Sequence, residues 1–206
     1  MLDKLLVQAR RISHVIAWLG GALLLAAALV VTVEVLARKF FGWSMQGADE
    51  LSGYAFAIGC SWAFGLAVLQ RANVRIDGLY LLAPVPLRAV MDITALAMLA
   101  LYVAAMLSSG WVLWADSVNF NSRSITPWRT PLAIPQGLWL AGWAWMATVL
   151  VLLLLRCGQA LLKGSLADVV EVAGVRTMAE EVKDELATAA EEVAHERELR
   201  QRRGDS

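Results

Sequence analysis

Four long apolar stretches, separated by polar connections, dominate the pattern of this chain: Val15–Val35, Leu51–Leu69, Val90–Trp114 and Leu138–Leu155. Each is close to the ~20 residues that a helix needs to cross the hydrocarbon core of a bilayer. Because hydrocarbon offers no hydrogen-bond partners, the backbone has to pair with itself, and a helix achieves that within one segment. The pattern predicts an all-α polytopic membrane protein, with four transmembrane helices within 14–158, a lead-in at 1–13 and a charged tail at 159–206.

Composition supports this assignment and excludes several other classes. Hydrophobic residues make up 59% of the chain and the mean hydropathy is +0.59, which leaves too little polar surface for a soluble domain. The net charge is zero and no basic stripe is present, so nothing indicates nucleic-acid binding. Cys60 and Cys157 lie far apart in or beside the spans, and we interpret both as small apolar fillers.

The distribution of basic residues predicts the orientation in the membrane. One side carries eight of them: Lys4, Arg10, Arg11, Arg71, Arg75, Arg88, Arg156 and Lys163. The other side carries Arg38, Lys39, Arg123 and Arg129. The richer side is expected to be cytoplasmic, and with an even number of spans both termini lie there. Tryptophans concentrate on the predicted outer side, where indoles favour the headgroup level: Trp43, Trp111, Trp114, Trp128, Trp139 and Trp143.

The two ends of the chain both have amphipathic patterns. Met1–Ser13 reads either as a helix lying on anionic membrane lipid or as a cytoplasmic extension of the first span. In the charged tail, apolar residues recur at three- and four-residue spacing from Val175 to Val193, which predicts an amphipathic helix. This helix could pack on a partner or on the cytoplasmic face of the protein. Alternatively, it could be mostly exposed to solvent.

Small residues in the second span form two rows. Gly53, Ala57, Ser61 and Gly65 make one row, and Ala55, Gly59, Ala63 and Ala67 make the other. At ~100° per residue the rows lie on roughly opposite sides of a helix. Small residues at this spacing allow helices to approach closely in a bilayer, so we predict that the second span is sandwiched between two neighbours. The alternative is that Gly and Ala are simply common in membrane spans.

The second and third connections both contain prolines, which limit where the following helices can begin. Pro84 and Pro86 predict that the third span begins after them, near Arg88–Asp92. In the third connection, Pro131 and Pro135 predict extended backbone over Thr130–Gln136, because a residue before proline avoids the α region.

Glu34 lies near the outer end of the first span, and a carboxylate within a membrane is a functional candidate by default. One interpretation is a proton carrier, as in small exporters with a membrane-embedded glutamate. Arg38 follows at the four-residue spacing of helical ion pairs, which favours a structural pair.

Other charges flank the second span. Asp49 and Glu50 precede it, where the helix dipole stabilises each carboxylate by ~0.3–1 kcal/mol, and they could also meet basic residues of a partner. At the other end, Arg71 and Arg75 share a helical edge, followed by Asp77. This edge would bind lipid phosphate or a partner protein.

The sequence lacks the usual signatures of catalysis and cofactor binding. His14 and His195 are the only histidines, so the pairs that a transmembrane haem needs are absent. No phosphate-binding glycine loop, zinc-ligand spacing or nucleophile triad occurs, and we expect no enzymatic activity, cofactor or metal. The spans also lack the interrupted pair that marks a self-sufficient secondary transporter.

Four segments together resemble a known family. Glu34–Ser44 and Ala48–Phe56, followed by Asn73–Asp77 and Thr130–Gln136, are similar in order and spacing to segments of the small membrane subunit (DctQ-like) of tripartite ATP-independent periplasmic (TRAP) transporters. The similarity covers about Val15–Leu155, with four spans in the same arrangement.

The resemblance implies a scaffold subunit in the bacterial inner membrane. A large membrane subunit would carry an organic acid together with sodium, and a periplasmic substrate-binding protein would dock on the outer face. The implied interface residues are Glu34, Arg38, Trp43, Asp49 and Glu50 on the outer face, Arg71, Arg75 and Asp77 on the inner face, and Thr130, Pro131, Pro135 and Gln136 in the outer loop. The alternative from another class is a proton-coupled, homo-oligomeric small exporter that uses Glu34.

Overall fold

The computed structural model describes residues 2–71, 80 and 82–174, together with four isolated positions in the tail, 182, 186, 189 and 190. Residues 1–174 form one compact unit and 175–206 another. Within the described part of the first unit the helices are α1 (Leu2–Phe41), α2 (Ala48–Leu69), α4 (Val85–Asn119), α5 (Ala133–Leu162) and α6 (Leu166–Ala173). The amphipathic helix predicted for the tail lies outside the described residues.

Four of these helices, α1, α2, α4 and α5, are long and apolar enough to cross a membrane. The described residues contain no β-strand, only an isolated bridge between Arg123 and Pro131. The predicted all-α fold with four spans is therefore confirmed. The orientation of the termini remains a prediction.

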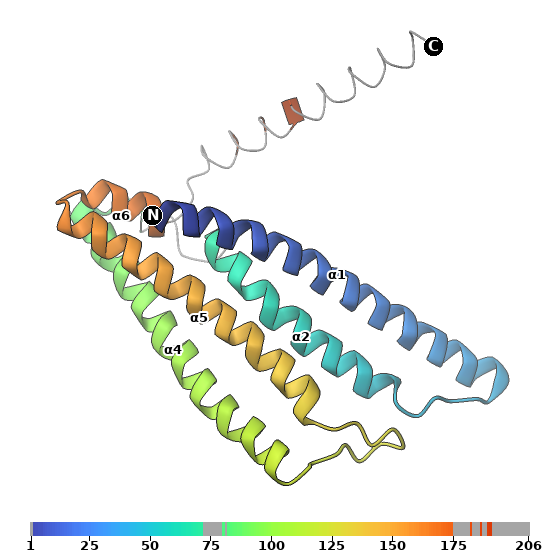
Figure 1. Cartoon of the computed structure of the whole chain (residues 1–206). Coiled ribbons are helices and arrows are strands. Elements are labelled where there is room, and N and C mark those ends of the chain that lie inside the picture. The colour runs from blue at the N-terminus through green and yellow to red at the C-terminus, as the bar shows by residue number, and fades with distance from the viewer. Residues whose placement is uncertain are drawn as a thin grey trace, which may run out of the picture. The chain divides into compact units, whose positions relative to one another are not determined.

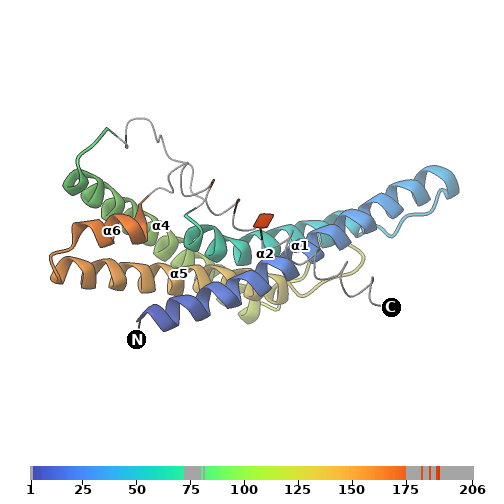
Figure 2. The ribbon, with the colours of Figure 1, turned by 90° about the horizontal axis from the view of Figure 1, so that it is seen from above.

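The helices lie side by side in the order α1, α2, α5, α4 (Figure 1). In this order α2 packs on both α1 and α5, and α5 packs on both α2 and α4, with a smaller contact between α1 and α5. The short helix α6 packs across α4 and α5 near the end at which α1 begins, as the view from above also shows (Figure 2). The arrangement places α5 centrally and leaves α1 at one edge.

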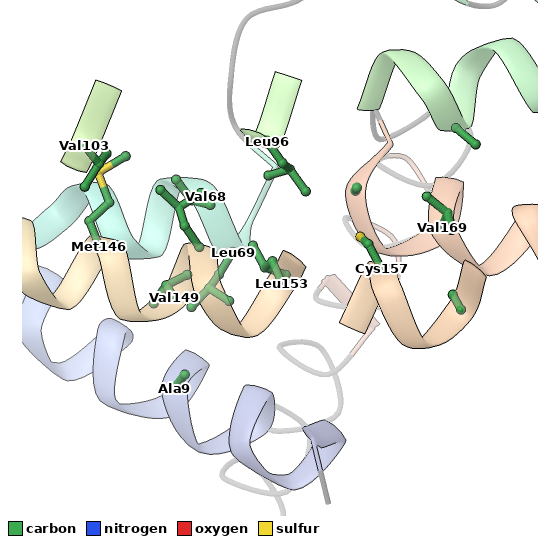
Figure 3. Close-up of a cluster of buried hydrophobic side chains, with 14 of the residues drawn as sticks. Ala9, Val68, Leu69, Leu96, Val103, Met146, Val149, Leu153, Cys157 and Val169 are labelled. Atoms are coloured by element: carbon green, nitrogen blue, oxygen red, sulfur yellow. The ribbon is translucent and has the colours of Figure 1, made fainter. Parts of the chain in front are cut away.

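The hydrophobic core follows α5 because this helix has neighbours on several sides. Its inward positions are Leu140, Trp143, Met146, Val149, Leu150, Leu153, Cys157 and Ala160. Val68 and Leu69 of α2, and Leu96 and Val103 of α4, close around them (Figure 3). In the most apolar window of α5, 39% of residues are buried, against 6% for α1. The edge helix α1 therefore leaves most of its apolar surface uncovered.

The two small-residue rows of α2 face its two neighbours. Gly59 lies against Gly20 of α1, where an added Cβ would come within 3.3 Å of the Gly20 carbonyl oxygen. On the α5 side, an added Cβ at Gly65 would lie 2.8 Å from the Trp145 ring. Gly53 is different: an added Cβ would meet nothing within 4 Å, so the packing role predicted for this residue is not found within the chain.

Some helix boundaries differ from those expected, and one agrees with an interpretation that the sequence left open. Helix α1 is continuous from Leu2, which is the extension of the first span given as one of the two interpretations, and Asp3 pairs with Arg156 of α5 at 2.9 Å. At about 1.5 Å per residue, its 40 residues reach about 60 Å, well beyond a ~30 Å hydrocarbon core. The compact unit also extends past 158, because α6 buries Val169 and Ala173 against α4 and α5.

Two of the remaining differences arise from proline. Helix α4 begins at Val85, earlier than expected, with Pro84 as its N-cap residue and Pro86 in its first turn. Helix α5 begins at Ala133, so Pro135 lies in a first turn and the segment 133–136 is helical rather than extended. Proline is tolerated there because the first N–H groups of a helix have no partner within it.

Trp143 was expected at the membrane interface, and that prediction is wrong. The side chain is 8% exposed and its ring contacts those of Phe64, Tyr102 and Trp139, with centroid distances of 5.5, 6.0 and 6.1 Å. Its position on the inward face of the central helix outweighs the preference of indole for the headgroup level.

Candidate functional site

The connection between α1 and α2, residues 42–47, is folded around the carboxylate of Glu34. This side chain is buried although it lies in the last turns of α1. Its Oε1 accepts hydrogen bonds from the Ser44 hydroxyl at 2.5 Å and from the Arg38 guanidinium at 2.8 Å, and its Oε2 accepts from the Met45 backbone N–H at 2.8 Å. The ion pair expected from the spacing is present, but Glu34 also holds the connection that follows the helix.

The backbone conformation of Gly42 allows this connection to turn back toward Glu34. Gly42, directly after α1, has φ +62°, a left-handed conformation that glycine adopts without strain at a helix end. Trp43, the next residue, has 58% of its surface exposed. The chain thus turns at Gly42, presents Trp43 outward and returns to Glu34 through Ser44 and Met45.

A second carboxylate organises the other connection at this end. Glu50, in the first turn of α2, accepts a hydrogen bond from the Tyr54 hydroxyl at 2.7 Å on Oε1 and one from the Thr126 hydroxyl on Oε2. The hydroxyl of Ser124 lies 2.8 Å from that of Thr126. Glu50 therefore ties α2 to the connection between α4 and α5.

In that connection, residues 120–132, the chain reverses direction and its two halves pair with each other. The Ser124 N–H donates to the Thr130 carbonyl and the Leu132 N–H donates to the Ser122 carbonyl, both at 3.0 Å. These bonds flank the bridge between Arg123 and Pro131 and hold the hydroxyls in position for Glu50.

The two connections also touch directly. The Trp128 indole N–H donates to the Met45 carbonyl at 3.1 Å. The indole covers Gly47, where an added Cβ would lie 2.8 Å from Nε1, so a larger residue at 47 would displace the ring. We call the two connections, together with Glu34 and Glu50, the loop platform.

The exposed side chains of the loop platform suit binding to a protein surface. Ile125 is fully exposed at the tip of its connection, and Trp43 and Trp128 are about half exposed. Charged side chains are interspersed: Arg123 and Arg129 are exposed within the platform, and Asp49 is exposed in the adjoining first turn of α2. Among residues 2–71 and 82–174, no three His, Cys, Asp or Glu side chains come together in a way that could hold a metal ion. Exposed apolar groups rimmed by charges are typical of interaction sites.

Comparison with known families matches this chain over residues 27–159 to the model of the tripartite ATP-independent periplasmic transporters, DctQ component. The chain belongs to the DctQ family. No curated protein and no solved structure gave a significant match. The predicted resemblance is confirmed, and the chain is a multi-pass membrane protein and a small component of a TRAP transporter.

The DctQ match covers the whole loop platform, together with α2 and α4. Of the outer-loop residues that the resemblance implied, Thr130 and Pro131 lie within the platform, whereas Pro135 is buried in the first turn of α5. Gln136 follows in the same turn, and its buried Oε1 has no hydrogen-bond partner in the described part of the chain. An interface role for these residues remains a proposal.

Of the three interface residues implied for the opposite end of this DctQ chain, the structure describes Arg71. Arg71 lies two residues beyond the end of α2, after the C-cap residue Gln70, and has φ +55°. Arg75 and Asp77 lie outside the described residues, so their assignment to an inner face remains a prediction.

Sequence reasoning missed a buried carboxylate at this opposite end. Asp92 in α4 has no exposed surface and accepts a hydrogen bond from the Tyr80 hydroxyl at 2.6 Å. The Arg88 guanidinium lies 5.5 Å from the centre of the Tyr80 ring. The available signal was a single aspartate at the start of an apolar stretch, which indicates a paired polar group. Asp92 fixes Tyr80, and with it one point of the α2–α4 connection, onto α4.

Proposed function

We propose that this chain is the scaffold subunit of a binding-protein-dependent importer that moves an organic acid with sodium across the bacterial inner membrane. It supports the large membrane subunit of the transporter and does not itself bind the solute. Both termini face the cytoplasm, and the loop platform faces the periplasm, where the substrate-binding protein docks.

The observation that carries this proposal is the use of the two carboxylates in the loop platform. Glu34 accepts three hydrogen bonds and Glu50 at least two, all from groups of the same chain. A transport site needs polar groups that exchange partners with an ion or solute during the cycle. These carboxylates instead hold two connections in a fixed shape, which is what a rigid docking surface requires.

The exposure of α1 supports the part of the proposal that concerns the large subunit. This helix lies at the edge of the row and only 6% of its most apolar window is buried within the chain. Its exposed residues include Trp18, Leu19, Leu25 and Leu29. Lipid or another membrane protein has to cover this surface, and a subunit that packs along a large partner presents such a face.

The distribution of positive charge supports the proposed orientation, with both termini in the cytoplasm. Lys4, Arg10, Arg11 and Arg156 lie at the end opposite the platform, and excess positive charge favours the cytoplasmic side. A reporter fused after Ser206 should be active in the cytoplasm, and a periplasmic signal from this fusion would contradict the orientation.

Reconstitution in proteoliposomes tests the proposal. The large subunit, this chain and the binding protein loaded with its organic acid should together give uptake that depends on a sodium gradient. Omission of this chain should abolish uptake or strongly reduce it, and this chain alone should give none. Sodium-coupled uptake by this chain in the absence of the large subunit would contradict the proposal.

The alternative, a homo-oligomeric exporter driven by protons through Glu34, has its support in the position of this carboxylate within an apolar helix. The two proposals differ in what Glu34→Gln does. In an exporter, the substitution abolishes proton-coupled transport and leaves assembly intact. In a scaffold, Gln still accepts a hydrogen bond through its amide oxygen, and uptake by the complete transporter continues.

A further inference from the structure

Two buried polar atoms of α5 have no hydrogen-bond partner among the side chains that the structure describes: Oε1 of Gln136 and Nε1 of Trp143. The spacing of seven residues places them two turns apart on one face of the helix, at a separation of about 10 Å. No water is available in a bilayer core, so an unpaired polar group there is unfavourable. Because buried polar groups in native proteins are nearly always paired, this face of α5 indicates a contact that the chain itself does not supply.

This face of α5 is directed between α2 and α4. The ring of Trp143 contacts that of Phe64 from α2 and that of Tyr102 from α4, with centroid distances of 5.5 and 6.0 Å. Toward the loop platform lies a groove of about 230 Å³, which α2, α4 and the start of α5 line. Gln136 and Leu113 are part of its lining. One unpaired atom therefore belongs to a side chain of an open groove, and the other lies two turns along the same face.

The α2 side of the groove is suited to a further helix. Ala57 lines the groove, and Gly53, one turn away in the same row of small residues, is exposed, with open space around an added Cβ. Further along this row, Gly65 lies closely against Trp145 of α5. The row thus packs on a helix at one end and, within the described part of the chain, on none at the other. Small residues allow a rigid helix to approach closely, whereas a flexible acyl chain does not require them.

The spacing of the two unpaired atoms distinguishes a helix from a lipid as the occupant. The hydrogen-bonding groups of a phospholipid lie at the polar surface of the bilayer, and its acyl chains have none. A lipid that pairs with Gln136 would leave the Trp143 indole, about 10 Å further along α5, facing acyl chains. Side chains two turns apart on a transmembrane helix can pair with both, since Ser, Thr, Asn and Gln form hydrogen bonds between membrane helices.

Side-chain rotations make both atoms accessible. The terminal torsion of glutamine is broad, so the Gln136 amide can turn into the groove that it lines. The Tyr102 ring, which lies against Trp143, is 53% exposed, and exposed side chains change rotamer within nanoseconds. A helix that enters the groove can therefore pair with groups that are unpaired in the chain alone.

We propose that the groove between α2 and α4 binds one transmembrane helix of the large membrane subunit, an inference that rests on the proposed function. The helix packs against Gly53 and Ala57. It carries a polar side chain opposite Gln136 and a hydrogen-bond acceptor opposite Trp143, two turns apart on an otherwise apolar face, because an indole N–H can only donate.

Energy transfer between labelled subunits in liposomes, with this chain titrated against the large subunit, tests the proposal. Gln136→Leu removes the amide at similar size and should weaken the complex by roughly three- to tenfold, as expected for one hydrogen bond between membrane helices. The unfolding midpoint of the chain alone should stay the same or rise slightly, because the lost oxygen has no partner there. A lower midpoint would show that the amide stabilises the chain itself and would overturn the proposal.

Two glycine variants test the groove independently of the amide. Gly53→Leu should leave the chain alone as stable as before and weaken the complex by roughly tenfold or more, because the added side chain occupies the space of the incoming helix. Gly158→Leu makes the same change at an equally open position near the other end of α5, and it should leave the complex unchanged. Equal binding by the two variants would contradict a helix in the groove.

Photo-cross-linking in native membranes identifies the occupant. Leu113 lines the groove and is 52% exposed, so benzoylphenylalanine in its place should cross-link to the large subunit. Cross-links only to lipid, or to a second copy of this chain, would overturn the inference. If the unmodified chain does not bind the large subunit, the proposed function fails as well. A complex that forms and is unaffected by Gln136→Leu and Gly53→Leu would overturn this inference alone.

Discussion

The backbones of Gly20 in α1 and Gly59 in α2 lie directly against each other. A Cβ added at Gly20 would come within 3.2 Å of the Gly59 carbonyl oxygen, and one added at Gly59 within 3.3 Å of the Gly20 carbonyl oxygen. In a bilayer no hydrophobic effect draws helices together, so close backbone contact and van der Waals packing carry the association. At this pair the backbone of the edge helix α1 makes close contact with that of α2.

Gly59→Leu should separate α1 from α2. The added side chain has no room against the α1 backbone, and overpacking of this kind costs about 1–3 kcal/mol. We expect a lower unfolding midpoint in detergent. Gly53→Leu is the matched control, because it makes the same change in the same helix at a position with open space around it. Equal destabilisation by the two variants would contradict the packing described for α2.

Glu34→Ala should loosen residues 42–47. The variant removes the acceptor for the Met45 N–H, the Ser44 hydroxyl and the Arg38 guanidinium, and hydrogen bonds to charged groups contribute about 1.5–3 kcal/mol. Hydrogen exchange at the Met45 amide should accelerate by roughly one to two orders of magnitude. Asp49→Ala, which removes an exposed carboxylate nearby, serves as the control. Unchanged exchange in Glu34→Ala would show that the carboxylate does not hold the connection.

The Glu50–Thr126 contact should appear as an energetic coupling between the two connections. A double-mutant cycle with Glu50→Ala and Thr126→Val should give an interaction of about 0.5–3 kcal/mol in the free energy of unfolding. Thr94→Val is a suitable comparison, because the Thr94 hydroxyl donates to the Val90 carbonyl of its own helix. Glu50→Ala and Thr94→Val should be additive within about 0.5 kcal/mol. Additivity in the Glu50–Thr126 cycle as well would mean that this hydrogen bond does not join the connections.

Tyr80→Phe should destabilise the end of the molecule opposite the platform. The variant removes the hydroxyl that donates to the buried Asp92 carboxylate, at an expected cost of about 1–3 kcal/mol. Tyr102→Phe removes the same atom from a half-exposed tyrosine whose ring packs against that of Trp143, and it should have little effect. Similar unfolding midpoints for the two variants would contradict the role given to Asp92.

Features that depend on local spacing were predictable from the sequence. The four spans follow from length and hydropathy, the Glu34–Arg38 ion pair follows from four-residue spacing, and the sandwich around α2 follows from two rows of small residues. In each case the pattern lies within one helix, so the geometry of a helix converts the sequence directly into neighbours in space.

Features that join distant segments were not predictable in the same way. The Thr126–Glu50 bond spans 76 positions in the chain and the Trp128–Met45 bond spans 83. Hydroxyls and indoles in a connection rich in turns have many possible partners, and only the packing of α2 beside α5 selects these. The burial of Trp143 has the same origin, because the central position of α5 is a property of the assembled helices and not of its own sequence.

Purification of the native assembly in mild detergent, followed by measurement of its mass and subunit stoichiometry, tests the central claim most directly. The account predicts an equimolar complex of this chain with one much larger multi-spanning membrane protein, and a chain that is unstable when produced without that partner. A stable homo-oligomer of this chain, free of any larger membrane subunit and active in transport, would contradict it.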